Sequence, residues 1–77
     1  MKGTIKMEQL KEKFPSYTPN YVLDEIAYYF KKTSSGKLDV FTLDNAISLV
    51  NLAIVNERIS EEQGKVIKNQ IQDIKKN

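Results

Sequence analysis

Apolar side chains recur along this chain at the three- and four-residue spacing of an α-helix, and this pattern predicts four helical segments. The first covers about residues 5–13, and Pro15 ends it because proline disfavours helical geometry at the preceding residue. The second starts with Thr18 as the expected N-cap and Pro19 at the first helical position, and it continues to about Lys32. Its apolar side consists of Val22, Leu23, Ile26, Ala27, Tyr29 and Phe30.

A polar break separates the second segment from the least polar stretch of the chain. Within this break, Gly36 is expected to take a left-handed conformation and let the chain reverse. Residues 45–56 then carry no charge, although 29% of all residues are charged, so this stretch must be buried. It is too short to cross a bilayer, which needs about 20 residues. It therefore predicts a core helix that Asp39 or Thr42 caps and that ends near Asn56.

The fourth segment has a clear start, because Ser60 and Gln63 have the spacing of a capping box. One face of the helix that follows carries Ile67, Ile71 and Ile74. Residues 38–43 offer an extended alternative at the start of the third segment, and no other part of the sequence is typical of a strand. We therefore predict an all-α fold, a compact bundle of four short helices formed by residues 1–77 as one domain, in which the third helix is central.

Composition argues against several classes of function. The chain contains neither cysteine nor histidine, which removes the usual zinc ligands and the commonest catalytic groups. It has no glycine-rich phosphate loop or calcium loop, so we expect no enzyme activity, no cofactor and no metal. Twelve basic and ten acidic residues give a net charge of +2, too little for a strong attraction to nucleic acid. Charged residues interrupt the start of the chain where a signal peptide would be apolar, so we expect a cytoplasmic protein without a membrane span.

Tyrosines offer the first candidate for a binding surface. Tyr21 and Tyr28 are seven residues apart, so they share the predicted outer side of the second helix. Lys32 lies on the same side, and Tyr17 just precedes the helix. Amphipathic aromatic rings on an exposed face are typical anchors of protein interfaces. The alternative is that the first helix or the chain terminus covers Tyr21 and Tyr28, which would make them part of the core.

The wide apolar arc of the third helix offers the second candidate. Its main arc consists of Leu43, Ala46, Ile47, Val50, Ala53 and Ile54. Leu52 and Val55 fall outside this arc among polar residues, where Asn51 and Ser48 could hydrogen-bond across an interface. The excess apolar surface is covered either by the rest of a monomer or by a second copy of the chain, as a homodimer. The candidate partner-binding residues are Tyr17, Tyr21, Tyr28, Lys32, Asn51 and Val55.

A small DNA-binding regulator is the alternative function. The third and fourth helices are joined closely enough for a helix-turn-helix, and the fourth displays lysines such as Lys65 and Lys68 away from its isoleucines. The turn over residues 57–59 lacks the usual glycine, however. Glu61 and Glu62 would also repel phosphates at the helix end that should approach DNA. We therefore expect a protein partner and not nucleic acid.

Three further features of the chain are a composition rich in lysine, asparagine and isoleucine, the helix start Pro19-Asn20-Tyr21-Val22, and the helix junction from Leu52 to Gln63. In these features the chain resembles small helical proteins encoded by phages and prophages of low-GC Gram-positive bacteria. The resemblance implies a non-enzymatic accessory factor of a phage or another mobile element. Such a factor binds and modulates a bacterial host protein, for example a component of host defence. The resemblance assigns no role to any single residue.

Overall fold

The computed structural model describes residues 7–36 and 40–76, which form four helices. In chain order they are α1 (Met7–Lys13), α2 (Asn20–Ser34), α3 (Val40–Val55) and α4 (Glu61–Lys76). Neither described range contains a strand, which confirms the prediction of an all-α bundle. The extended alternative is wrong for residues 40–43, because they belong to α3, and residues 38 and 39 lie outside the described ranges.

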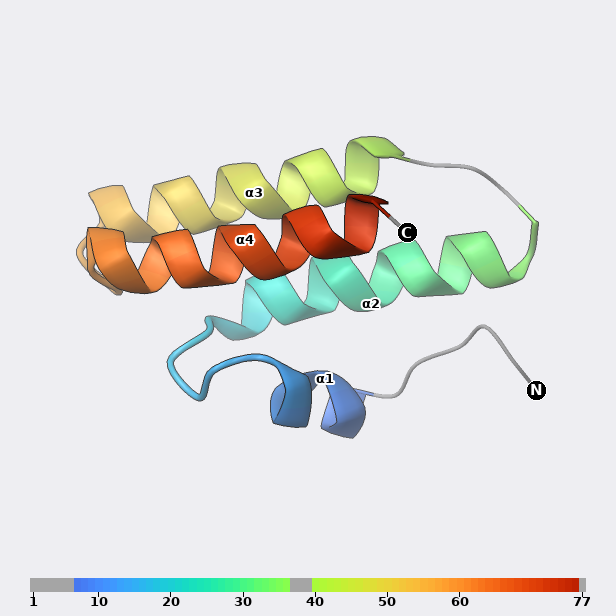
Figure 1. The fold of residues 1–77 in the computed structure, drawn as a ribbon, viewed down its shortest axis with the longest axis horizontal. Coiled ribbons are helices and arrows are strands. Elements are labelled where there is room, and N and C mark those ends of the chain that lie inside the picture. Colours follow the sequence, from blue (N-terminus) through green and yellow to red (C-terminus); the bar gives the residue numbers. More distant parts are fainter. Residues whose placement is uncertain (1–6, 37–39, 77) are drawn as a thin grey trace.

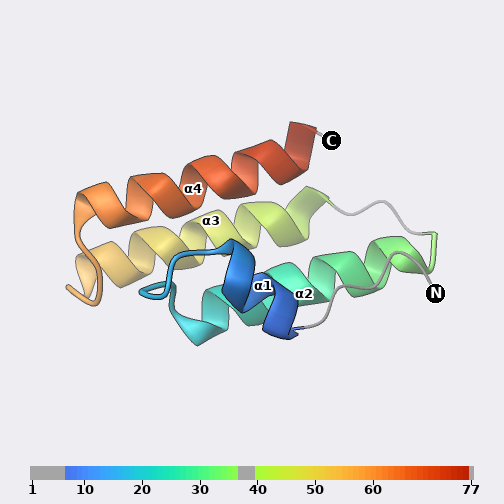
Figure 2. The same ribbon diagram turned by 60° about the horizontal axis from the view of Figure 1, so that its bottom comes forward.

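α3 is the central helix of the bundle, as predicted. It packs against α2 on one side and against α4 on another, whereas α1 packs against α2 (Figure 1). The three longer helices alternate in direction, so α2 and α4 begin at the end of the molecule where α3 ends (Figures 1 and 2). One half of the molecule therefore contains the starts of α2 and α4 and the end of α3, and the other half contains the start of α3 and the ends of α2 and α4 (Figures 1 and 2). Each half has its own charged side chains.

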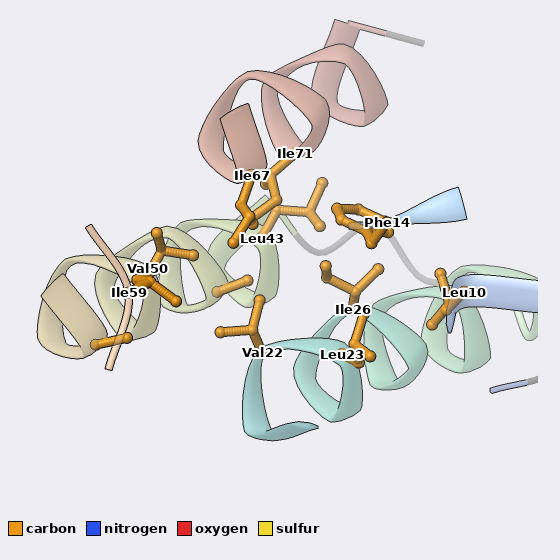
Figure 3. Packing of buried hydrophobic residues seen from close by; sticks show 12 residues of the cluster. Leu10, Phe14, Val22, Leu23, Ile26, Leu43, Val50, Ile59, Ile67 and Ile71 are labelled. Carbon is orange, nitrogen blue, oxygen red and sulfur yellow. The ribbon is translucent and has the colours of Figure 1, made fainter. Parts of the chain in front are cut away.

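The core is formed by the apolar sides that the residue spacing predicted. Figure 3 shows the buried side chains of α2, α3 and α4 pointing toward one another. The buried apolar residues of these helices are Val22, Leu23, Ile26, Leu43, Ala46, Val50, Ala53, Ile67 and Ile71. Full burial of a large aliphatic side chain contributes about 1.5–3 kcal/mol relative to leaving it in water. These contacts stabilise a chain that has no cysteine and therefore no disulfide.

α1 closes the groove between α2 and α4. Leu10 of α1 and Phe14 just after it are both buried in the common core. The side-chain Nε2 of Gln70 in α4 donates a hydrogen bond of 3.0 Å to the backbone carbonyl of Lys13. Lys13 also lines a small hollow together with Phe30 of α2 and Ile74 of α4. α1 thus completes the core at this groove. The expected start of its helix at residue 5 lies outside the described residues.

The start of α2 differs from the prediction. Pro19, in an extended conformation with φ −61° and ψ 145°, occupies the N-cap, and its carbonyl accepts hydrogen bonds from the N–H groups of Val22 and Leu23. Thr18 therefore lies one residue too early for its hydroxyl to cap the helix, and the prediction of Thr18 as N-cap is wrong. Thr18 is buried, and its hydroxyl oxygen has no hydrogen-bond partner among the described residues.

The other helix ends test the remaining predictions about caps and turns. Gly36 has φ 87°, the left-handed conformation expected after α2. Thr42 lies inside α3 and is buried, so it does not cap that helix, and Asp39 lies outside the described residues. The capping box of α4 is confirmed: the N–H of Gln63 donates to Oγ of Ser60 at 3.1 Å, and the N–H of Ser60 donates to Oε1 of Gln63 at 2.9 Å.

The link between α3 and α4 starts with a Schellman motif that has no glycine. The N–H of Arg58 donates to the carbonyl of Ala53 at 2.9 Å, and the N–H of Glu57 donates to the carbonyl of Ile54 at 3.0 Å. Glu57 has φ 63°, a left-handed conformation that costs a residue with a Cβ roughly 1–2 kcal/mol. The turn therefore forms without the usual glycine, and a strained glutamate takes the left-handed position in its place.

Candidate protein-binding surface

One side of α2 carries two aromatic rings, each close to a cation. Tyr21, Glu25, Tyr28 and Lys32 follow one another at intervals of three or four residues and therefore share this side. Nζ of Lys32 lies 4.7 Å from the centre of the Tyr28 ring. The guanidinium carbon of Arg58, just beyond α3, lies 5.8 Å from the centre of the Tyr21 ring. We call Tyr21, Tyr28, Lys32 and Arg58 the tyrosine edge.

The two tyrosines of this edge differ in burial. Tyr28 is 49% exposed, whereas Tyr21 is half-buried and packs against the core. Cation–π contacts of this kind contribute about 0.5–1 kcal/mol at exposed sites, and they restrict the rotamers of both partners. The contact with Lys32 therefore favours one position of the Tyr28 ring, while the residue stays 49% exposed. The first helix does not cover it, since α1 closes the groove between α2 and α4.

A second exposed surface lies on the outer side of α3. Five residues with no charge among them recur there at alternating spacings of four and three. They are Phe41, Asn45, Ser48, Leu52 and Val55, and we call them the α3 stripe. Phe41 and Val55 are each 75% exposed, and Leu52 is 49% exposed. α3 therefore presents apolar side chains to water as well as to α2 and α4.

Charged and polar side chains of α4 border the α3 stripe. Nζ of Lys75 forms an ion pair of 2.7 Å with Oδ1 of Asp44 in α3. Nζ of Lys68 donates a hydrogen bond of 2.8 Å to Oδ1 of Asn51, also in α3. Both contacts are exposed, so each contributes little to stability, typically about 0–1 kcal/mol. Their effect is to hold two lysine ammonium groups beside α3.

The structure divides the six predicted partner-binding residues among several places. Tyr21, Tyr28 and Lys32 lie together in the tyrosine edge, and Val55 belongs to the α3 stripe. Asn51 lies between the α3 stripe and α4. Tyr17 is half-buried and packs against the core, as Tyr21 does, but it precedes α2 and is not part of the tyrosine edge.

Two exposed apolar residues of the α3 stripe, Phe41 and Leu52, were not among the predicted partner-binding residues. The sequence pattern places Phe41 in the extended alternative for residues 38–43 and Leu52 outside the main apolar arc of the third helix. One pattern in the sequence places both residues on the same side of the third helix. The alternating spacing of four and three that links residues 41, 45, 48, 52 and 55 is the spacing of a helix–helix seam.

α3 and α4 do not have the geometry expected of a helix-turn-helix. They run side by side in opposite directions along their lengths (Figures 1 and 2). In a helix-turn-helix the two helices cross at roughly 90–120°, which leaves the second helix free to enter a groove of DNA. Here α4 lies along α3, and its Lys68 and Lys75 contact α3 residues. The arrangement therefore gives no support to the DNA-binding alternative.

Comparisons with protein-family models, with curated proteins and with solved structures found no match to this chain. Across residues 7–36 and 40–76, no helix is long and apolar enough to cross a membrane. The same residues contain no group of three or more aspartate, glutamate, histidine or cysteine side chains that could hold a metal ion. The exposed residues and the cation–π contacts make the tyrosine edge and the α3 stripe the candidate binding surfaces of the described residues.

Proposed function

We propose that this protein acts by binding another protein through the tyrosine edge of α2 and that it does not catalyse a reaction. The observation that carries the proposal is Tyr28, a residue that is 49% exposed and whose ring stands under the Lys32 ammonium group. Tyrosine and arginine are enriched among the residues that dominate binding energy at protein interfaces, and Arg58 lies against the neighbouring Tyr21. A ring that is already positioned loses less conformational entropy on binding than a mobile one.

The chemistry of the edge indicates the kind of partner. Two cations and two phenol groups favour a surface with carboxylates beside an apolar pocket, because the ring fills the pocket while the cations pair with the acids. Together with the resemblance to phage and prophage proteins, this supports an accessory factor of a mobile element that binds and modulates a bacterial host protein. Host-defence components are one class of target to examine first.

Affinity capture from a Gram-positive host lysate tests the proposal, with Tyr28→Ala as the test variant and Val66→Ala as the control. Val66 is 45% exposed on α4, so its truncation removes a similarly accessible apolar group elsewhere. We expect both the wild type and V66A to retain the same partner and Y28A to lose it.

The retained partner is then purified and its affinity measured by calorimetry. Truncation of an interface tyrosine typically costs more than about 1–2 kcal/mol, which corresponds to about tenfold weaker binding or more. No retained protein, or equal affinity for Y28A and the wild type, would contradict the proposal. Tyr21 is a poorer probe, because it packs against the core and its truncation also lowers stability.

A further inference from the structure

The α3 stripe exposes apolar surface on a helix that is apolar on nearly all its sides. A helix of this composition is normally buried all round, and α2 and α4 pack against only part of α3. α2 and α4, by contrast, are amphipathic and turn polar residues to water. The exposed fractions of Leu52 and Val55 therefore point to a further contact on this side of α3.

We propose that a second copy of the chain covers the α3 stripe and that the two α3 helices pair antiparallel across a two-fold axis. The spacings of four and three along the stripe match the seam of a coiled-coil pair. A two-fold interface requires a surface that is complementary to itself. The inference goes beyond the proposed function, because it concerns a different surface and a different partner.

The order of residues along the stripe meets this requirement in one antiparallel register. With the axis between residues 46 and 47, Phe41 of each copy lies opposite Leu52 of the other. The same register places Asn45 of each copy opposite Ser48 of the other. Apolar residues thus meet where Phe41 and Leu52 face each other, and an amide meets a hydroxyl on either side of the axis, where both can hydrogen-bond. Val55 lies beyond these pairs, opposite residue 38, which is outside the described residues.

The charge distribution favours the antiparallel pair over a parallel one. The half of the bundle formed by residues 20–27 and 48–68 carries five acidic and three basic side chains. The half formed by residues 28–34, 40–47 and 69–76 carries four basic and two acidic ones. An antiparallel two-fold lays the acidic half of one copy against the basic half of the other. A parallel pair would bring halves of like charge together, which is unfavourable.

The same two-fold has a consequence for the flanking helices. Rotation about an axis that lies in the interface and crosses α3 brings α2 beside α2 and α4 beside α4 of the other copy. Glu25 then lies at the same end of the dimer as Lys32 of the second copy. Glu61 likewise lies at the same end as Lys75 of the second copy. The two tyrosine edges come to lie on the same side of the dimer, so a dimer would offer them to a partner together.

Sedimentation equilibrium tests the inference with a pair of matched variants. We expect the wild type to have about twice the chain mass of 8.9 kDa. Leu52→Lys places an ammonium group opposite Phe41 of the other copy, and we expect dimer dissociation to become at least about tenfold more favourable. Val66→Lys introduces a lysine at a similarly exposed apolar site on α4 and should leave the dimer intact. Circular dichroism should show equal helix content in all three proteins.

Disulfide trapping tests the register, and the absence of natural cysteines makes the readout unambiguous. Asn45→Cys and Ser48→Cys are made as separate variants, which mass spectrometry distinguishes. In the antiparallel register we expect a mixed disulfide from the two variants together and little homodisulfide from either alone. Rapid homodisulfide formation by each variant alone would instead indicate a parallel pair and overturn the register.

A wild type that sediments as a monomer at every concentration at which it stays soluble would overturn the inference as a whole. A dimer that L52K leaves intact would show that copies pair through another surface. Neither result affects the proposed function, which depends on Tyr28 and on capture of a different protein. Conversely, a dimer dissociated by L52K stands even if no other protein is ever captured.

Discussion

Gly64 marks a close approach between α3 and α4, and its replacement by alanine tests how tightly these helices pack. Gly64 is buried near the start of α4, and a Cβ at this position would clash with Cδ1 of Ile54 and would lie 2.9 Å from its Cγ1 and 3.4 Å from Cγ1 of Val50. Helix propensity alone favours alanine over glycine by about 1 kcal/mol. Overpacking a methyl group into a filled contact costs about 1–3 kcal/mol. Because Ile54 is only half-buried and can shift part of the way, we expect Gly64→Ala to lower the free energy of unfolding by about 1 kcal/mol.

A second substitution separates the clash from other effects of the new methyl group. Ile54→Ala removes the side-chain atoms nearest to the Cβ, and by itself it lowers stability. In this background Gly64→Ala no longer meets an obstacle, so helix propensity should make it stabilising by about 1 kcal/mol. The expected coupling energy between the two sites is therefore about 2 kcal/mol.

The measurement is urea unfolding followed by far-ultraviolet circular dichroism for the wild type, G64A, I54A and the double variant. All four are compared at one chain concentration, because self-association would make apparent stability depend on concentration. The slope of free energy against urea should stay constant, which shows that the same surface unfolds. An equal effect of Gly64→Ala in both backgrounds would refute the close approach between these helices.

Three further substitutions test other parts of the fold by the same unfolding measurement. Val50→Asp places an unpaired charge at a fully buried position of α3 and should abolish the cooperative melt. The free-energy cost of burying this charge exceeds the small stability of a 77-residue domain. A retained melt would contradict the central place of α3. Glu57→Gly should raise stability by up to about 1 kcal/mol by relieving the left-handed strain, whereas Glu57→Gln, which keeps the Cβ, should not. Ser60→Ala should lower stability by about 1 kcal/mol through loss of the capping box, and Ser60→Asn should retain most of it; equal losses for both would mean that the Ser60 side chain does not act as the cap.

The helices and the core were predictable because they depend on local signals. The spacing of apolar residues selects the buried side of each helix, and the pair Ser60 and Gln63 defines the start of α4 within a few residues of chain. The cap of α2 was less predictable, because Thr18 and Pro19 are adjacent and both are acceptable at a helix start. Residue preference favours Thr18, whereas in the structure Pro19 takes the extended conformation of the N-cap.

The binding surfaces were less predictable, because burial depends on contacts between residues distant in the sequence. Tyr21 and Tyr28 have the same helical phase, so the sequence alone treats them as equivalent. In the structure Tyr21 packs against the core and meets Arg58, a residue 37 positions later, whereas about half of Tyr28 stays exposed. Helical phase therefore identified the tyrosine edge but could not rank its two rings.

The position of α1 explains why the α3 stripe is exposed. The sequence alone left open where the first helix docks. The hydrogen bond from Gln70 to the carbonyl of Lys13, together with burial of Leu10 and Phe14, places α1 at the groove between α2 and α4. The chain thus uses its one short helix to complete the core at that groove, and Leu52 and Val55 remain accessible on α3. Exposed apolar residues such as Leu52 and Val55, on a stripe where Phe41 and Leu52 complement each other in an antiparallel pair, are what pairing with a second copy requires.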